Sequence, residues 1–399
     1  MITVEEALAI LRRTCAAGPE EAVPLREGLH RVLARAVRSD VDWPPFDASA
    51  MDGYAIRLDD LAQRRTLRER PGLVAAGDRP GPALSSGEAV RVMTGAPIPR
   101  GSEAIVPVEE VRRENGEIFT QSRPRPGEHI RRRGESVAAG TVLLEPGRRL
   151  SPAGIALAAL AGAEPLPVYR RPRVTIAVTG NELVSTTERP GPGQLRDSNG
   201  PMLLALCAAS GWPAAARAAV ADEDGAVRRL FSEAGRDEDV LITSGGVSAG
   251  DLDLLPAEAE RAGFKILVHG VAVRPGKPVA FGRRDATLWF GLPGNPVSTS
   301  LCFHLFVRYA LDCLEGAASP GPPVRQARLE RDVAVRGRRE TYRDALLEES
   351  GGQIRVTPLD TRGSHDLAAH GRSNALIRIP ADAERLPAGS VVDCLVLPI

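Results

Sequence analysis

The hydrophobic positions of this 399-residue chain change period several times along its length. The first ones recur at helical spacing, at Val4, Ala7, Leu8 and Leu11. Thr3 and Glu6 form a capping box at the start of this predicted helix. A second helix is predicted at SPAGIALAALAGA, which has Ser151 as its N-cap, Pro152 in its first position and Gly162 at its end.

Between these helices, from about residue 41 to residue 140, helical spacing is poor. Short β-type runs such as EAVRVM and EAIVPV alternate with Gly/Pro turns. The pattern predicts a β-rich insertion whose two flanking segments belong together.

From Arg173 onward, buried strands alternate with helices. The predicted order is strand VTIAV, helix PMLLALCAASG, strand VLIT, helix LLPAEAERAG, strand TLWFGLP and a helix over about 297–311. This alternation predicts an α/β domain with a mainly parallel sheet and helices on both faces. Ligands of such sheets bind at the carboxyl ends of the strands, and three of those ends here carry glycine-rich loops.

The stretch GAASPGPP, at 316–323, has the composition of a linker. Beyond it, short strand-like pieces such as QIRVTPL, NALIRIP and VVDCLVLP predict a small β-barrel or sandwich. The C-terminal region is therefore expected to be a separate β domain.

The composition is that of an ordinary soluble globular protein, with 43% hydrophobic and 26% charged residues and a formal net charge of zero. The balanced charge argues against nucleic acid as the main partner. The longest apolar run, near 154–163, is shorter than the roughly 20 residues that a membrane span needs. Acidic residues precede any apolar run at the N-terminus, which does not fit a signal peptide, so we expect a cytoplasmic protein without membrane partners.

The five cysteines are scattered and form no CxxC pair: Cys15, Cys207, Cys302, Cys313 and Cys394. This spacing favours neither a disulfide framework nor a thiolate zinc site, and we expect most of these side chains to be buried as small hydrophobes. The histidines are dispersed as well. His365 and His370 are close in sequence, but such a pair is more typical of a surface or a core than of a metal site.

The first glycine-rich loop, TSGGVSAGDLD, follows the strand VLIT. Gly245 and Gly246 allow close approach of a ligand to backbone N–H groups, which suits an anion. Further donors are the hydroxyls of Thr243, Ser244 and Ser248. Asp251 and Asp253 add carboxylates, and donors beside carboxylates indicate a phosphate with Mg²⁺. The alternative is a tight turn with an aspartate cap.

The second loop, GLPGNPVS, has Asn295 placed to cap a helix that has Pro296 in its first position. Free N–H groups and the helix dipole favour an anion there, although plain capping is the alternative. The stretch TGNEL brings Glu182 to a third strand end, RDSN precedes the next helix, and Asp222 is expected after a further short strand. Caps and turns remain the alternative for these residues.

The stretch RPGKP is rigid and basic. Lysine occupies two of the 51 basic positions, Lys265 and Lys277, and arginine occupies the other 49. A lysine within RPGKP is therefore suggestive of a chemical role, because a compact ammonium differs from a guanidinium fork. The alternative is a surface turn.

In the insertion, Asp52 is expected in an Asp-Gly turn beside Tyr54, and the stretch VMTGAPIP offers Thr94. The run Arg131–Arg133 fits either an anion site or a solvated face. No GxxxxGK[ST] loop occurs, so the sequence gives no support to a P-loop NTPase.

Ten stretches together resemble the molybdopterin molybdenumtransferase family, which includes MoeA-type proteins and the E domain of gephyrin. They are SAMDGYA, RVMTGAPIP, IRRRGE, TGNEL, DSN, SGGVSAGDLD, RPGKP, GLPGNPVS, GRRETYR and GSH. They occur in the family's order and cover nearly the whole chain, which makes the resemblance specific.

The resemblance implies an elongated homodimer with four domains in each subunit. Domain I is discontinuous, with residues 1–40 and 141–170. The β-rich insertion domain II covers 41–140, the α/β molybdopterin-binding domain III covers 171–315, and the C-terminal β domain IV covers 320–399.

The resemblance also implies a reaction. The family takes adenylylated molybdopterin and molybdate, hydrolyses the AMP linkage with Mg²⁺ and leaves molybdenum on the pterin dithiolene. The lack of soft protein ligands fits, since an oxyanion needs only hydrogen-bond donors and positive charge. Transient partners would be the adenylyltransferase and recipient molybdoenzymes.

The site residues follow from the matched motifs. Catalytic roles are implied for Asp52, Glu182, Asp222, Asp253 and Lys277, with Mg²⁺ on Asp222 and Asp253. Residues expected to bind the adenylylated pterin are Thr94, Arg131, Thr179, Gly180, Asp197, Ser198, Ser244, Gly245, Gly246, Ser248, Gly250, Asp251, Pro293, Gly294, Asn295 and Pro296. Residues expected to hold molybdate are Arg274, Lys277, Pro278, Ser298, Arg338 and Ser364. In the homodimer, Asp52, Thr94 and Arg131 are expected to reach the partner subunit's cleft.

Three positions depart from common family residues. Ser136 replaces an aspartate, Gly270 replaces a lysine of some members, and Arg274 replaces a lysine. Two alternatives stay open: an adenylyltransferase, which shares the SGG-type domain, and a non-catalytic pterin-binding scaffold. The preference for molybdate over tungstate is not predicted.

Overall fold

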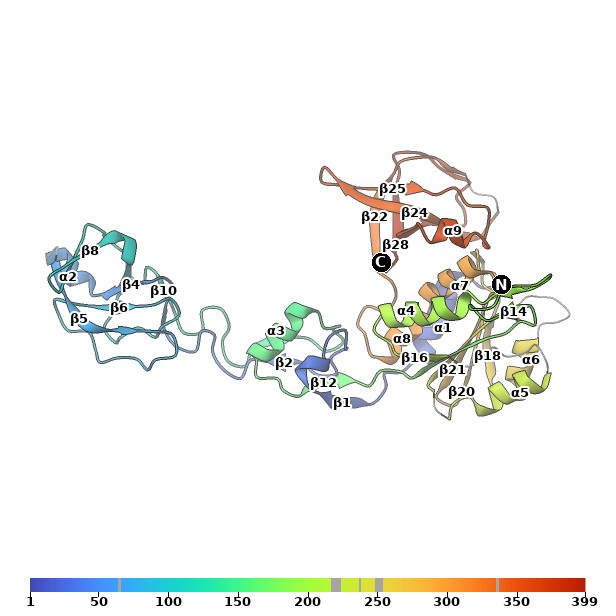
Figure 1. The fold of residues 1–399 in the computed structure, drawn as a ribbon, viewed down its shortest axis with the longest axis horizontal. Coiled ribbons are helices and arrows are strands. Elements are labelled where there is room, and N and C mark those ends of the chain that lie inside the picture. Colours follow the sequence, from blue (N-terminus) through green and yellow to red (C-terminus); the bar gives the residue numbers. More distant parts are fainter. Residues whose placement is uncertain (64–65, 217–223, 237, 248–253, 335–336, 399) are drawn as a thin grey trace. The chain divides into compact units, whose positions relative to one another are not determined.

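A computed structural model describes residues 1–63, 66–216, 224–236, 238–247, 254–334 and 337–398, which fold as two compact units (Figure 1). The insertion unit comprises Ala36–Glu145 and Ala153–Glu164. The main unit comprises Met1–Arg35, Pro146–Pro152 and Pro165–Ile399. This division is coarser than the four expected domains, whose boundaries stay a prediction.

The insertion unit is built on a six-stranded sheet of order β7-β4-β6-β5-β9-β8. Its strands are β4 (Gly53–Ile56), β5 (Thr66–Val74), β6 (Glu88–Val92), β7 (Ala104–Pro107), β8 (Val111–Glu114) and β9 (Glu117–Thr120). A Cβ on Gly53 would lie 2.3 Å from the carbonyl oxygen of Val106, so glycine permits this close pairing of β4 with β7. The expected Asp-Gly turn is wrong: residues 50–52 form a bend, and Gly53 already belongs to the strand.

Smaller elements complete the insertion unit. They are the pairs β2 (Val37–Arg38) with β11 (Val142–Leu144) and β3 (Ala48–Ser49) with β10 (Ile130–Arg131), and the helices α2 (Leu58–Gln63) and α3 (Pro152–Leu160). The helix predicted after Ser151 is thus confirmed. It ends where Gly162 takes a φ of +73°.

The main unit contains an α/β part with a six-stranded sheet of order β16-β13-β17-β21-β20-β18 (Figure 1). The strands are β13 (Val174–Val178), β16 (Ala214–Ala216), β17 (Val240–Ser244), β18 (Lys265–His269), β20 (Ala280–Arg284) and β21 (Thr287–Leu292). The first four in this order are parallel to one another, and β20 pairs antiparallel with both β21 and β18, so the sheet is mixed. The reason is a hairpin: only two residues separate β20 from β21, and Asp285 adopts a φ of +52° there.

Helices cover both faces of this sheet, as predicted. Residues of α1 (Val4–Thr14), α4 (Asn199–Ala209), α7 (Pro296–Cys302) and α8 (Arg308–Leu314) share one apolar core. Residues of α5 (Asp224–Glu233) and α6 (Leu254–Arg261) share the other. The capping box of Thr3 and Glu6 is confirmed. The single helix expected over 297–311 is instead α7 and α8 joined by a π-helical turn, Phe303–Val307.

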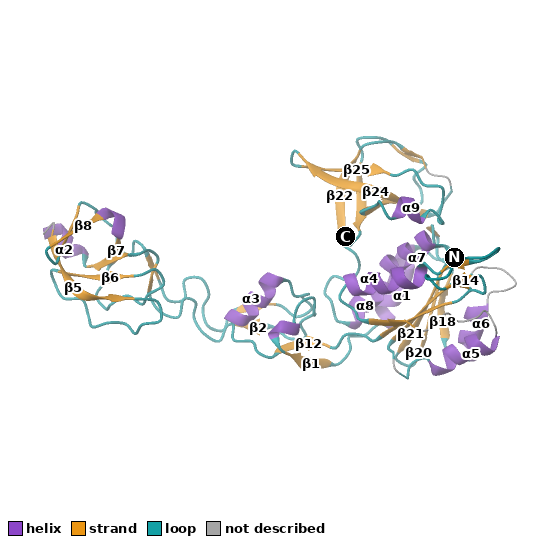
Figure 2. Cartoon of the chain, in the orientation of Figure 1, coloured by secondary structure: helices purple, strands orange, loops and turns teal. Residues whose placement is uncertain are grey.

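Most of the regular elements in the C-terminal part are strands, which long loops connect (Figure 2). They are β22 (Val324–Leu329), β24 (Glu340–Ser350), β25 (Gln353–Pro358), β26 (Ala375–Ile379) and β28 (Val391–Val396). The sheet order is β24-β25-β22-β28-β26, and β24 also pairs with β26. This pairing closes the sheet, so the expected β domain is a five-stranded barrel. The strand β19 (Val273–Arg274) of the α/β part adds to β24.

Three of the five cysteines are buried, as expected: Cys207, Cys302 and Cys394. Burial raises the pKa of Cys207 to about 12, which makes this thiol unreactive. Among the helices within the described residues, none combines the length and the apolar character that crossing a membrane requires.

Candidate ligand site at the strand ends

Three glycine-rich loops meet at the carboxyl ends of β13, β17 and β21. The three strands are consecutive and parallel in the sheet. Thr179 N donates to Ser244 O at 2.9 Å, and Gly245 N donates to Leu292 O at 3.1 Å. The adjacency that the sequence predicts for these loops is therefore present.

Gly245 and Gly246 are held in conformations that favour glycine, with φ of +100° and +61°. A Cβ on Gly245 would lie 2.5 Å from Thr179 O. A Cβ on Gly246 would lie 3.0 Å from Leu255 Cγ. The first glycine-rich loop thus needs both glycines to pass between Thr179, of the stretch TGNEL, and Leu255, of α6.

The hydroxyls of Thr243 and Ser244 are not available as ligand donors, contrary to expectation. Both side chains are fully buried. Trp289 Nε1 donates to Thr243 Oγ1 at 2.9 Å. Ser244 Oγ accepts from Asn199 Nδ2 at 2.9 Å and donates to Pro293 O at 3.3 Å. These hydroxyls hold the loops together. The strand β17 continues through Ser244, and both side chains are buried, on opposite faces of the sheet, because helices cover both faces.

Two other buried polar atoms lack a hydrogen-bond partner among the described residues. They are Thr179 Oγ1, in a residue 4% exposed, and Asn199 Oδ1, in a residue 8% exposed. Asn199 Nδ2 also donates to Gly294 O at 2.7 Å, so this side chain links α4 to the second loop. Unpaired buried polar atoms are costly, which makes both groups candidates for a ligand. Asn199 was missed among the predicted site residues, although it ends the stretch RDSN.

Three other predicted site residues lie near α4 and β13, and each has a different local environment. Asp197 Oδ1 accepts from Gly200 N at 2.9 Å, as a helix-capping side chain does. Ser198 occupies the N-cap position of α4 without a side-chain capping bond. Glu182 is exposed, and its carboxylate folds back on Gly180, 2.7 Å from the place a Cβ would take.

Several predicted site residues lie outside the described residues: Asp222, Ser248, Gly250, Asp251 and Asp253. Within the described part of the chain, no group of three or more His, Cys, Asp or Glu side chains is arranged to hold a metal ion. Of the predicted site carboxylates in the α/β part, the structure describes Glu182 and Asp197.

The second loop departs from the expected anion site. Asn295 occupies the N-cap position of α7 and Pro296 opens the helix, but the Asn295 side chain makes no capping bond. Instead, Asn295 Nδ2 donates to Ser364 Oγ at 2.9 Å, and Val297 N donates to Ser364 O at 3.1 Å. The start of this seven-residue helix is thus covered by a barrel loop.

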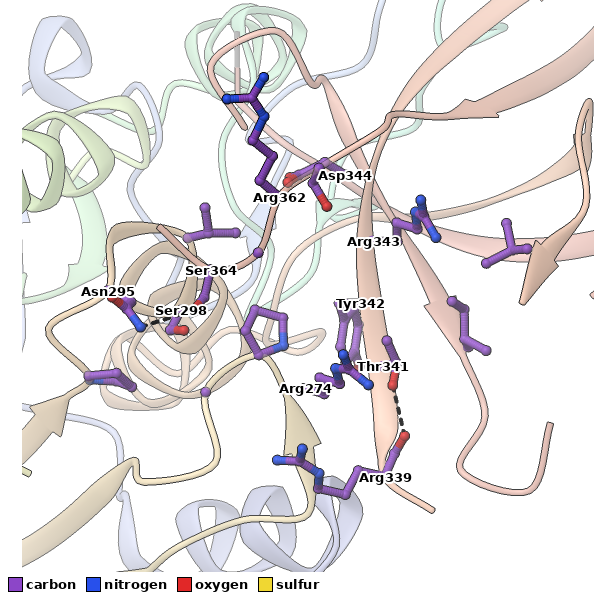
Figure 3. Close-up of a pocket in the computed structure, with 18 of the residues that line it drawn as sticks. Arg274, Asn295, Ser298, Arg339, Thr341, Tyr342, Arg343, Asp344, Arg362 and Ser364 are labelled. Atoms are coloured by element: carbon purple, nitrogen blue, oxygen red, sulfur yellow. Dashed lines mark hydrogen bonds between the residues drawn. The ribbon is translucent and has the colours of Figure 1, made fainter. Parts of the chain in front are cut away.

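Beside this contact lies a cavity of about 690 Å³ between the α/β part and the barrel (Figure 3). Its lining includes six predicted residues, Arg274, Pro278, Pro293, Asn295, Ser298 and Ser364. Two predicted molybdate residues do not line it: Lys277 is exposed beside it, and Arg339 takes the place expected for Arg338.

The cavity is rich in positive charge. Four arginines line it, Arg274, Arg339, Arg343 and Arg362, and Asp344 is the only carboxylate among its described lining residues. Arg339 Nη1 donates to Val273 O at 3.4 Å, and Arg343 Nη2 lies 3.9 Å from Asp360 Oδ1. Sequence reasoning missed three of these arginines, although GRRETYR contains two of them. Such a lining suits a small oxyanion.

In the insertion unit, Asp52 and Thr94 contact each other across 42 residues of sequence. Thr94 N and Thr94 Oγ1 both donate to Asp52 Oδ1, each at 2.7 Å. These hydrogen bonds hold the pKa of Asp52 below its ordinary value, so the side chain is ionised at neutral pH.

In the arginine run of the insertion unit, Arg132 and Arg133 form ion pairs with aspartates. Arg132 Nη1 donates to Asp47 at 2.7 Å, and Arg133 Nε donates to Asp42 at 2.6 Å. Arg131 is exposed. Two of the three side chains therefore form solvated ion pairs.

Family models match most of the chain. Residues 2–162 match the MoeA N-terminal region (domain I and II), 175–312 match a probable molybdopterin binding domain, and 326–397 match the MoeA C-terminal region (domain IV).

The chain also has full-length relatives. A molybdopterin molybdenumtransferase of Nostoc is 36% identical over 95% of this chain and 89% of the relative. One from Bacillus subtilis is 34% identical over 99% and 94%. A crystal structure of the molybdopterin biosynthesis moeA protein from Pyrococcus horikoshii OT3 matches with a TM-score of 0.84 and 30% identity, over 99% of this chain and 100% of that one.

Proposed function

Because this chain belongs to the MoeA family of molybdopterin molybdenumtransferases, we propose that its strand-end loops and its arginine-lined cavity act together on one substrate pair. The protein is a molybdopterin molybdenumtransferase of molybdenum cofactor biosynthesis, and its substrates are molybdopterin and molybdate. The observation that carries the proposal is the continuity of the two sites, since Pro293 and Asn295 of the second glycine loop also line the cavity.

The strand-end loops hold the phosphate-bearing part of an adenylylated molybdopterin. Gly245 and Gly294 support this role, because they bring two glycine-rich loops together: the Cβ position of Gly294 lies 3.8 Å from Gly245 Cα. Thr179 Oγ1 and Asn199 Oδ1 supply buried polar atoms that a bound molecule would satisfy. Hydrolysis adds water across the phosphoanhydride, so that the P–O bond breaks and AMP leaves while one phosphate stays on molybdopterin.

The cavity holds molybdate. Arg274 and Arg362 supply charge-assisted donors from opposite parts of its lining, and Ser298 and Ser364 supply hydroxyls. An oxyanion whose sulfur ligands come from the pterin needs no thiolate from the protein. The absence of cysteine from the described lining residues is consistent with this role.

The donor chemistry at the strand ends fits Mg²⁺. Glu182 presents an exposed carboxylate at the end of β13, beside the glycine loops, and carboxylate oxygen is the ligand type that Mg²⁺ prefers. Asp222 and Asp253 are the proposed partners of Glu182. Bound Mg²⁺ would neutralise negative charge on the phosphate oxygens of the substrate.

We further propose that the enzyme works as a cytoplasmic homodimer. Asp52, Thr94 and Arg131 would then complete the cleft of the partner subunit. The hydrogen bonds of Thr94 keep the Asp52 carboxylate ionised and fixed in direction, as a group that orients a substrate requires.

The test is a single-turnover assay with adenylylated molybdopterin, Mg²⁺ and molybdate, in which AMP release and dithiolene-bound molybdenum are both measured. We expect both products to depend on the protein and on Mg²⁺. Asp253→Ala should abolish turnover and retain ligand binding. If AMP release were the same without the protein, the proposal would fail.

Two alternatives predict different results, and the first needs a second assay that supplies molybdopterin and ATP in place of adenylylated molybdopterin. An adenylyltransferase would form adenylylated molybdopterin from molybdopterin and ATP, a reaction that leaves the cavity and the barrel without a role. A non-catalytic scaffold would show wild-type turnover no higher than that of Asp253→Ala.

A further inference from the structure

A chain of three polar side chains joins the cavity to the α/β part. His370 Nδ1 lies 2.6 Å from Asp344 Oδ1, and His370 Nε2 lies 2.9 Å from Ser300 Oγ. Asp344 is on β24 of the barrel, His370 ends the short helix α9 (Leu367–His370), and Ser300 is on α7. All three groups are largely buried.

The hydrogen-bond directions follow from the chemistry of the groups. A carboxylate only accepts, so Nδ1 carries a proton and donates to Asp344. Nε2 of the neutral ring then accepts from the Ser300 hydroxyl, and Nε2 of the charged ring donates to it. The chain is satisfied in either state, which makes it a fixed connection between β24 and α7.

The same three groups act as a nucleophile triad in serine hydrolases, but this arrangement does not fit that role. Ser300 lies inside α7 and is only 2% exposed, so no substrate carbonyl can reach its Oγ. Asp344, at the other end of the chain of hydrogen bonds, lines the cavity. The functional end of the chain is therefore the carboxylate.

Asp344 is the unfavourable group in a cavity for an oxyanion, because an unpaired carboxylate repels a bound anion. In the structure, Asp344 Oδ1 accepts hydrogen bonds from His370 Nδ1 and from Ser373 Oγ, the latter at 3.3 Å. We propose that His370 is a positioning residue: it holds the Asp344 carboxylate toward α9 and α7, and so keeps the arginine-lined space open to molybdate. This inference rests on the proposed function for the identity of the anion.

Binding of sodium molybdate to the full-length protein, measured by calorimetry, tests the inference. We expect His370→Leu to weaken binding by about tenfold, which corresponds to about 1.4 kcal/mol. Adding Asp344→Asn to that variant should restore most of the affinity, because it removes the released charge. A merely structural contact would behave in the opposite way, since a second change in the same contact would lower affinity further or leave it low.

Two further variants keep the test decisive. His370→Asn retains a donor near the Nδ1 position, and we expect it to bind almost as the wild type, even if leucine disturbs folding. His269→Leu, at an exposed position of edge strand β18 that does not line the cavity, is the matched control and should bind as the wild type.

The inference would be overturned by unchanged affinity in His370→Leu, by a double variant weaker than the single one, or by absence of molybdate binding to the wild type. Failure of the proposed function is read separately, from AMP release.

Discussion

Asn295 and Ser364 join the α/β part to the barrel through a side-chain hydrogen bond of 2.9 Å from Nδ2 to Oγ. Ser364 also accepts from Val297 N through its carbonyl oxygen. One barrel residue thus makes both contacts with the start of α7, at the edge of the proposed molybdate cavity.

Ser364→Ala should weaken molybdate binding without unfolding the protein. The substitution removes the hydroxyl and keeps the carbonyl bond to Val297. The expected loss is about twofold to tenfold, the net value of one hydrogen bond of about 0.5–1.5 kcal/mol. Ser350→Ala, at an exposed end of β24, is the control for calorimetry. Equal effects of the two variants would contradict the assignment.

Gly245→Ala should prevent formation of the first loop. The new Cβ would lie 2.5 Å from Thr179 O at a φ of +100°. Gly72→Ala is a close control, because Gly72 has a φ of +109° and nothing within 4 Å of its Cβ position. The control should lose only the backbone preference, about 1 kcal/mol, and keep activity.

Thermal melting and AMP release would separate the two effects in these glycine variants. We expect Gly245→Ala to lose turnover even at temperatures where it remains folded. Wild-type turnover in that variant would show that turnover does not depend on this loop conformation.

Lys277→Arg should lower kcat/KM for molybdenum insertion although the charge is kept. Lys277 is exposed beside the cavity, in a chain that uses arginine at nearly every other basic position. If the ammonium contacts substrate, a guanidinium cannot take its place at the same geometry. Lys265→Arg alters the only other lysine and should leave kcat/KM unchanged. Full activity in Lys277→Arg would remove Lys277 from the catalytic group.

Much of the α/β part and of the loop cluster was predictable because the information is local. Buried runs such as VLIT alternate with amphipathic helices, and Gly245 directly follows its strand. The antiparallel pairing at the edge of the sheet was harder to predict from the sequence, since the hairpin at Asp285 lacks the usual Asn-Gly or Asp-Gly signal.

The cavity was less predictable than the loops, because its lining depends on distant pairs. Asn295 and Ser364 are 69 residues apart, and Ser300 and His370 are 70 apart. No periodicity relates such residues, so the sequence predicted a cap at Asn295 where the structure has a contact between domains. The buried hydroxyl of Ser244 was missed for a related reason, since a loop motif does not show which way its side chains turn.

Asp239→Asn should reduce stability at neutral pH and have little effect near pH 2. Burial raises the pKa of Asp239, but hydrogen bonds from Arg170 and Arg173 outweigh it and lower the pKa to about 2. A carboxyl group with a lowered folded-state pKa stabilises the protein above its unfolded pKa of about 3.9, and the contribution is lost as pH falls toward the folded value.

Urea unfolding of wild type and Asp239→Asn between pH 2 and pH 7 would check this. The two midpoints should differ at pH 7 and converge as pH falls through that window. Asp382→Asn, at an exposed position, is the control. A constant difference across the range would mean that the ion pairs of Asp239 do not stabilise the fold.

Arg149→Met should strongly destabilise the main unit, because it leaves two buried carboxylates without their common partner. Arg149 Nη2 donates to Asp312 Oδ1 at 2.6 Å and to Glu315 Oε2 at 2.8 Å, and the Glu315 side chain is 0% exposed. Removing one member of a buried ion pair costs about 3–5 kcal/mol. The ion pairs that would remain are long, because Arg308 Nε lies 4.0 Å from Asp312 Oδ2 and Arg171 Nε lies 4.0 Å from Glu315 Oε1. The adjacent Arg148 is exposed, so Arg148→Met removes the same charge and should change the urea midpoint little. Burial raises the pKa of Asp312, so the loss in Arg149→Met should shrink as pH falls and this carboxylate gains a proton. Equal destabilisation by the two substitutions would show that net charge, and not this buried contact, determines the effect.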